Sequence, residues 1–210
     1  MTKLSNGKIA LLVIFFVLLC DQILKIWIKT NLVLYEDVKI TSWFILRFVE
    51  NAGMAFGIEV IGKLFLSLFR IVAVVLIGYY LISIIKQGVN AGFVVCLSLI
   101  LAGALGNILD SAFYGIIFSE SLPSSVAELF PSDGGYAPFL HGKVVDMFYF
   151  PLIEIEKLPD WVPFWGGGDF VFFRFIFNIA DAAVSVGVGA LLIFERKHLV
   201  SKSEETKSNA

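Results

Sequence analysis

Three aspartates lie in or beside long apolar segments of the chain, where a charged side chain is costly. They are Asp110, Asp146 and Asp181, and two of them end the same pattern, Asn107-Ile-Leu-Asp110 and Asn178-Ile-Ala-Asp181. This spacing places the asparagine and the aspartate on one face of a helix. A carboxylate at the bilayer centre costs about 2.5–3.5 kcal/mol, so such residues usually face a bundle interior and mark a functional site. Several carboxylates without a histidine cluster therefore predict acid–base chemistry in a membrane.

The composition is that of an integral membrane protein. Hydrophobic residues make up 58% of the 210 residues, and the mean hydropathy is +0.87, whereas soluble domains contain about 45–50% apolar residues. The net charge is −2, so no basic surface indicates nucleic-acid binding. Cys20 and Cys96 lie inside apolar runs and His141 and His198 are far apart, which argues against a disulfide and a structural zinc site. We expect no metal and no other cofactor.

Four apolar segments are each longer than the roughly 18 residues that cross a bilayer as a helix. They predict an all-α membrane protein with four transmembrane helices, at residues 9–28, 64–85, 91–118 and 170–194. The basic start before the first segment is also typical of a cleaved signal peptide. However, Leu19, before Cys20, is not the small residue of a processing site, and processing there would remove the first span. We therefore interpret this segment as a transmembrane helix.

Two long loops, residues 31–63 and 119–169, join the spans on one side. The first is rich in β-branched and aromatic residues and predicts a few short strands, which would form a small β-rich region outside the membrane. The second is rich in proline, glycine and aromatic residues and predicts turns near the membrane interface. Residues 197–210 are polar and predict a disordered cytoplasmic tail.

The basic residues nearest the span ends set the expected orientation. The two sides carry equal numbers of lysines and arginines, but those on the side of the termini flank short segments: Lys8, Lys86, Arg196 and Lys197. We therefore expect both termini in the cytoplasm and both long loops outside. In this topology Asp21, Asp110, Asp146 and Asp181 all lie at a similar depth near the outer face.

Five segments then occur in a fixed order along the chain: Asp21-Gln-Ile-Leu-Lys25, Asn51-Ala-Gly-Met-Ala-Phe-Gly57, Gly103-Ala-Leu-Gly-Asn-Ile-Leu-Asp110, Val144-Val-Asp-Met147 and Phe177-Asn-Ile-Ala-Asp181. Together with four spans they resemble the bacterial lipoprotein signal peptidases, also called signal peptidase II. The resemblance covers about residues 21–187, and five ordered motifs are far more specific than any one of them.

The resemblance implies a fold and an activity. Residues 1–196 would form a four-helix peptidase domain in the cytoplasmic (inner) membrane, in contact with membrane lipids. The enzyme would remove signal peptides from prolipoproteins that carry a diacylglyceryl group, cutting before the lipid-modified cysteine. We expect it to act as a monomer.

The resemblance also implies that Asp146 and Asp181 are the catalytic pair. Peptide hydrolysis without a metal or a covalent intermediate needs a base that activates water and an acid that protonates the leaving amine. Two carboxyl groups that share one proton supply both, and their titration belongs to the pair. Asp110 is the rival, because its Asn107 makes it look like Asp181, but the resemblance gives Asp110 a supporting role.

Several other motif residues have a structural interpretation beside the functional one. Asn51 and Gly53 form either a turn or a substrate-binding segment, in which Asn51 would bond the peptide or the tetrahedral oxyanion. Gly103 permits either close helix packing or close approach of the substrate. Asn107 and Asn178 either satisfy neighbouring carbonyl groups or serve the site.

Two further interpretations concern the first and last motifs. Asp21 and Lys25, four residues apart, form either a structural ion pair or a support of the site. The resemblance adds Ala180 to the supporting residues.

The chain departs from the family pattern in two places. The family usually has an arginine directly after the aspartate of the Gly-Asn-x-x-Asp pattern, and here Ser111 stands there. Serine cannot replace the charge-assisted hydrogen bonds of an arginine, and Lys143 is a candidate substitute. Residues 119–142 are an insertion relative to a minimal member, and we hypothesise that they form a lid or a substrate-selecting flap.

Two other classes of protein fit the sequence less well. A proton-coupled transporter predicts ionisable groups stepped across the membrane, but the inner halves of the spans are almost wholly aliphatic, as in residues 72–77 and 186–193. A scaffold protein would not need three acids gathered in two Asn-x-x-Asp patterns and a loop. The sequence therefore favours a membrane-embedded aspartic endopeptidase.

Overall fold

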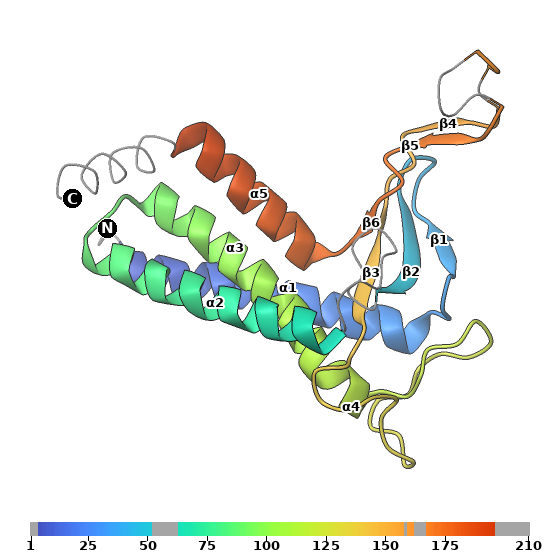
Figure 1. The fold of residues 1–210 in the computed structure, drawn as a ribbon, viewed down its shortest axis with the longest axis horizontal. Helices are drawn as coiled ribbons and strands as arrows, with labels where there is room; N and C mark the ends of the chain where they lie inside the picture. Colours follow the sequence, from blue (N-terminus) through green and yellow to red (C-terminus); the bar gives the residue numbers. More distant parts are fainter. Residues whose placement is uncertain (1–3, 52–62, 158, 162–166, 196–210) are drawn as a thin grey trace.

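The protein was analysed as a computed structural model, which describes residues 4–51, 63–157, 159–161 and 167–195. Within these residues the helices form four rods packed side by side, and a small antiparallel sheet lies at one end of them (Figure 1). The helices are α1 (Asn6–Asn31), α2 (Lys63–Lys86), α3 (Ala91–Leu109) and α5 (Ile179–Phe194), and α3 continues through a π-helical turn, η1 (Asp110–Tyr114), into α4 (Gly115–Ile117).

Three of these helices are long and apolar enough to cross a membrane, at Asn6–Asn31, Ser67–Lys86 and Ala91–Ile117. Large apolar side chains on their outer faces are exposed, among them Leu11, Val75 and Leu76. Apolar surface of this extent marks contact with a membrane. The prediction of a helical membrane protein is confirmed in this coarse form.

The fourth span was predicted from residue 170, and this boundary is wrong. The apolar helix α5 begins at Ile179 and has 16 residues, because an Asn178 capping box starts it. The Asn178 side chain accepts a hydrogen bond from the Asp181 backbone N–H (2.9 Å), and the Asp181 carboxylate accepts one from the Asn178 N–H (3.4 Å). These bonds satisfy two N–H groups that a helix start leaves unpaired.

The strands form two antiparallel sheets, one ordered β1-β2-β3-β6 and one made of β4 and β5. The strands predicted in the first loop are confirmed as β1 (Asp37–Lys39) and β2 (Ile45–Asn51). The second loop was expected to form turns, and this is wrong for two segments, β3 (Val144–Tyr149) and β4 (Ile153–Ile155). Two more strands, β5 (Phe170–Phe172) and β6 (Ile176–Phe177), take the place of the start predicted for the fourth span. Their β-branched and aromatic residues favour strands once a partner is beside them.

Two buried clusters hold this arrangement together. One lies among the helices and includes Ile84, Phe93, Val94 and Leu101. The other joins the end of α1 to the sheet and to the end of the third rod; it includes Ile28, Phe48, Tyr114, Phe118, Val145 and Met147. The second cluster places β3, which carries Asp146, against the membrane helices.

Candidate active site

Glycines on α3 allow three helices to meet beside the candidate site. A Cβ atom at Gly103 would overlap the carbonyl oxygen of Ala180 on α5. A Cβ atom at Gly106 would lie 2.8 Å from the Asp21 carboxylate and 3.1 Å from the Ala180 Cβ. Any larger residue would therefore force α3 away from α1 and α5, so the structure shows close helix packing at these positions.

The structure brings Asp146 and Asp181 to the same asparagine. The Asn178 side-chain nitrogen donates to Asp146 Oδ1 (2.7 Å), and the Asn178 backbone N–H donates to Asp181 Oδ2 (3.4 Å). Asn107 donates to Asp181 Oδ1 (2.8 Å) and accepts from Asn178 Nδ2 (3.2 Å). Both asparagines predicted from the Asn-x-x-Asp patterns thus contact a candidate catalytic carboxylate.

Asp146 lies in an environment that disfavours its charge. It is 5% exposed, and burial together with the negative charge of Asp181 raises its pKa to about 7. Two nearby carboxyl groups disfavour each other's charge, so such a pair can hold one proton near neutral pH. This arrangement can supply an acid and a base at the same time.

Asp181 faces a cavity of about 430 Å³. Most of the wall is apolar and comes from the β6 region and one face of α5; it includes Phe173, Phe175, Phe177, Ala182 and Ser185. An apolar cavity with a few polar groups is the usual form of a ligand site. Asp181 is therefore open to a ligand on one side, whereas Asp146 is buried.

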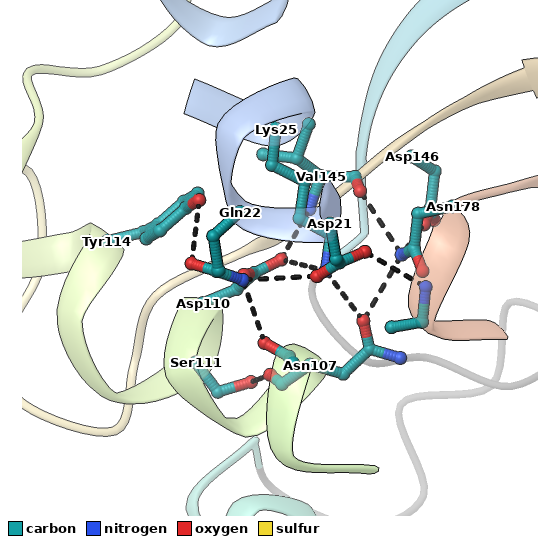
Figure 2. A network of polar contacts seen from close by, with 12 residues as sticks. Asp21, Gln22, Lys25, Asn107, Asp110, Ser111, Tyr114, Val145, Asp146 and Asn178 are labelled. Carbon is teal, nitrogen blue, oxygen red and sulfur yellow. Dashed lines mark hydrogen bonds and ion pairs between the residues drawn. The ribbon is translucent and has the colours of Figure 1, made fainter. Parts of the chain in front are cut away.

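Lys25 lies at the centre of a buried charge network beside these residues (Figure 2). Its ammonium contacts Asp21 Oδ2 (2.9 Å), Asp110 Oδ2 (2.8 Å) and Asn107 Oδ1 (2.9 Å), so each of its three protons has a partner. The side chains of Lys25, Asp21 and Asp110 are all fully buried. A buried charge is tolerated only when it is paired and hydrogen-bonded in this way.

The two carboxylates of this network also hold the backbone next to the candidate pair. Asp110 Oδ2 accepts from the Val145 N–H (3.2 Å), and Asp21 Oδ1 accepts from the Ala180 N–H (2.9 Å). Val145 and Ala180 each directly precede one of the two aspartates of the pair. Asp110 therefore contacts Lys25 and the β3 backbone.

Gln22 is a member of this network that the sequence interpretation missed. Its amide nitrogen donates to Asp110 Oδ1 (2.9 Å) and Asp21 Oδ2 (3.1 Å), and its oxygen accepts from the Tyr114 hydroxyl (3.2 Å). Gln22 lies between Asp21 and Lys25 in an apolar run, and this position could have indicated that its side chain belongs to the same buried network. The π-helical turn that begins at Asp110 carries Tyr114 toward Gln22, and such turns are frequent at functional sites.

The expectation that Lys143 replaces the family arginine is wrong. Lys143 Nζ pairs instead with Glu50 (3.4 Å) and Glu120 (3.5 Å), and the Ser111 hydroxyl bonds the Asn107 carbonyl (2.9 Å) within its own helix. The charge of Asp110 is balanced by Lys25, from a different helix. Sequence proximity to Asp146 was therefore a poor guide to contact.

Asn51 ends β2 opposite Val144, and Val49 lies opposite Asp146. Alternate residues of a strand share one face, so Asn51 and Asp146 are diagonal neighbours on the same face of the sheet, roughly 7–8 Å apart by the usual spacing. Gly53, the other residue predicted in this segment, lies outside the described residues.

Comparisons with known proteins agree on one family. The family described as signal peptidase (SPase) II matches residues 13–196. A lipoprotein signal peptidase of Porphyromonas gingivalis is 52% identical over 194 residues, which cover 92% of this chain and 85% of that protein. One of Amoebophilus asiaticus is 34% identical over 89% of this chain and 78% of that protein. A solved bacterial membrane enzyme has a TM-score of 0.61 at 23% identity, covering 92% of this chain and 90% of the other, and so shares the fold.

Proposed function

Since this chain belongs to the signal peptidase II family of lipoprotein signal peptidases, we propose that it is an aspartic endopeptidase of the inner membrane. It removes signal peptides from diacylglyceryl-modified prolipoproteins and cuts before the modified cysteine. The observation that carries the proposal is the placement of Asp146 and Asp181 on one asparagine, with the pKa of Asp146 raised to about 7. Two carboxyl groups that share one proton can carry out peptide hydrolysis without a metal or a covalent intermediate.

The proposed reaction uses one proton shared by the pair. Asp181, which lines the cavity, takes a proton from water, and the resulting hydroxide attacks the carbonyl carbon of the scissile peptide bond. The tetrahedral oxyanion forms within reach of the Asn51 amide, which stabilises it by donating a hydrogen bond. Asp146 gives its proton to the leaving nitrogen, the C–N bond breaks, and the proton on Asp181 passes to Asp146, which restores the starting state.

The cavity beside Asp181 supplies the proposed substrate site. Its aromatic and aliphatic wall suits an apolar segment of a signal peptide or an acyl chain of the lipid group. We place this site near the outer face of the membrane, with both termini in the cytoplasm, so that the lipid anchor of the substrate stays in the outer leaflet. The enzyme acts as a monomer, because all the residues proposed for the chemistry come from one chain.

The proposal is tested with the purified protein and two forms of one prolipoprotein. The form with the diacylglyceryl group should be cut directly before the modified cysteine, and the unmodified form should be cut far more slowly, because it lacks the second membrane anchor that holds the bond near the pair. Mass spectrometry of the products gives the position of the cut. An intact modified substrate, or a cut elsewhere, would contradict the proposal.

The pH dependence of kcat/KM should follow the titration of the pair. Asp146 acts as the acid, and its pKa is raised to about 7, so kcat/KM should fall tenfold per pH unit above about pH 7 as its proton is lost. A rate that stays constant from pH 6 to pH 9, with the protein still folded, would argue against this assignment of the acid.

A further inference from the structure

A second group of buried charges lies at the outer end of α1, one helical turn beyond Lys25. The Lys29 side chain is fully buried; it pairs with Glu50 of β2 and contacts Ser121 Oγ (2.6 Å). The Ser121 hydroxyl donates to Glu50 Oε1 (2.9 Å), and Lys143 Nζ lies 3.4 Å from Glu50 Oε2. We call Lys29, Glu50, Ser121 and Lys143 the Glu50 cluster.

The insertion at residues 119–142 is built into this cluster. It supplies Ser121, which is 2% exposed, and Tyr136, whose ring lies 5.0 Å from the Lys29 ammonium. Backbone bonds join the insertion to the end of α1 and the segment that follows it, from the Ala127 N–H to the Lys29 carbonyl (3.3 Å) and from the Leu34 N–H to the Leu122 carbonyl (3.1 Å). These contacts are those of a fixed support, and they differ from the lid or flap that the sequence suggested.

Glu50 occupies a position from which it can orient its neighbours on β2. It pairs with Val145, between the Val49–Asp146 and Asn51–Val144 pairs. Successive side chains alternate between faces, so Glu50 points into the cluster while Asn51 points to the face of Asp146. The register of β2 shifts between Leu46 and Val49, which leaves only three paired residues between that irregularity and the end of the strand.

We propose that the Glu50 cluster is a positioning device that holds Asn51 in register beside Asp146, and that the insertion completes it through Ser121. This rests on the role given to Asn51 in the proposed function. A slip of one residue would turn Glu50 out of the cluster and Asn51 away from the site. It would also leave Lys29 buried without its carboxylate, which strongly disfavours the slipped register.

The test uses one small substitution and a matched control in the same insertion. Ser121→Ala removes the hydroxyl that hydrogen-bonds both Lys29 and Glu50, and it changes no charge. Ser119→Ala removes a hydroxyl that, within the described part of the chain, accepts a hydrogen bond from the nearby Glu128 N–H (2.8 Å). Ser121→Ala should lower kcat/KM by roughly 10- to 100-fold, the range expected when a reacting geometry shifts by up to about 1 Å, and Ser119→Ala should match the wild type.

A double-mutant cycle shows whether the effect passes through Asn51. In an Asn51→Ala background, Ser121→Ala should cause little further loss, because the group that it positions is already gone. Equal losses in both backgrounds would mean a general structural effect and would overturn the proposal, and so would wild-type activity in Ser121→Ala.

Amide hydrogen exchange of β2 tests the proposal by a measurement that does not depend on peptidase activity. The amides of residues 49–51 should exchange faster in Ser121→Ala than in Ser119→Ala or the wild type. Unchanged exchange would overturn the positioning role even in an active enzyme. Faster exchange together with an inactive wild type would support the anchoring of β2 and contradict the proposed function instead.

Discussion

Replacing Asp146 or Asp181 with asparagine should lower kcat for a diacylglyceryl-modified prolipoprotein by about 10³-fold or more, the scale seen when one member of a catalytic group is removed. Asparagine has nearly the same shape but can neither take a proton from water nor give one to the leaving amine. Both variants should keep the wild-type Kd for an uncleaved substrate, because asparagine keeps the shape of the side chain and the apolar residues of the cavity wall are unchanged. Single-turnover cleavage and substrate binding, measured side by side, separate these quantities.

Asp110→Asn is the matched control for these variants. Asp110 lies in the neighbouring network and bonds the Val145 N–H and Lys25, so its loss should disturb the position of β3 without removing a proton-transfer group. We expect a smaller fall in kcat together with a lower Tm. Full activity in Asp146→Asn or Asp181→Asn would refute the assignment of the pair. If kcat fell as far in Asp110→Asn as it does in the other two variants, Asp110 would belong to the proton-transfer chemistry.

The sequence predicted best what is local. The Asn-x-x-Asp spacing predicted that Asn178 and Asp181 act together, and the structure shows a further local reason, since the two residues cap α5 for each other. The same cap was not used to place the start of the helix, because residues 170–177 are as apolar as a span. Hydropathy alone does not separate an aromatic strand from the first turns of a membrane helix.

Contacts between distant segments were predicted less well. Gln22 meets Asp110 across 88 residues of sequence, and Lys29 meets Glu50 across 21. Neither pair has a fixed spacing from which it could be found. Lys143 lies close to Asp146 in sequence, but its ammonium pairs with Glu50 and Glu120. The ordered motifs identified the family, whereas the partners of each charge required the fold.

Lys25→Met should be the most destabilising of the single substitutions of charged residues at the site. Lys25 is the cation between two fully buried carboxylates, and removing one partner of a buried ion pair costs about 3–5 kcal/mol because the charge that remains has no compensation. Lys8→Met, at an exposed position near the start of the same helix, should leave the stability almost unchanged. Thermal unfolding of both variants in the same detergent measures the difference.

A second substitution distinguishes uncompensated charge from lost packing. Adding Asp110→Asn to Lys25→Met removes one of the two stranded carboxylates, so the double variant should be more stable than the sum of the two single effects predicts. Methionine keeps most of the volume of the lysine stem, so lost packing alone would give additive effects. Additive losses would therefore mean that Lys25 and Asp110 contribute to stability independently. A Tm of Lys25→Met equal to that of Lys8→Met would mean that the buried carboxylates have another source of compensation. Recovery of stability without recovery of activity is the expected result, because the Val145 backbone, next to Asp146, would still lack its charged acceptor.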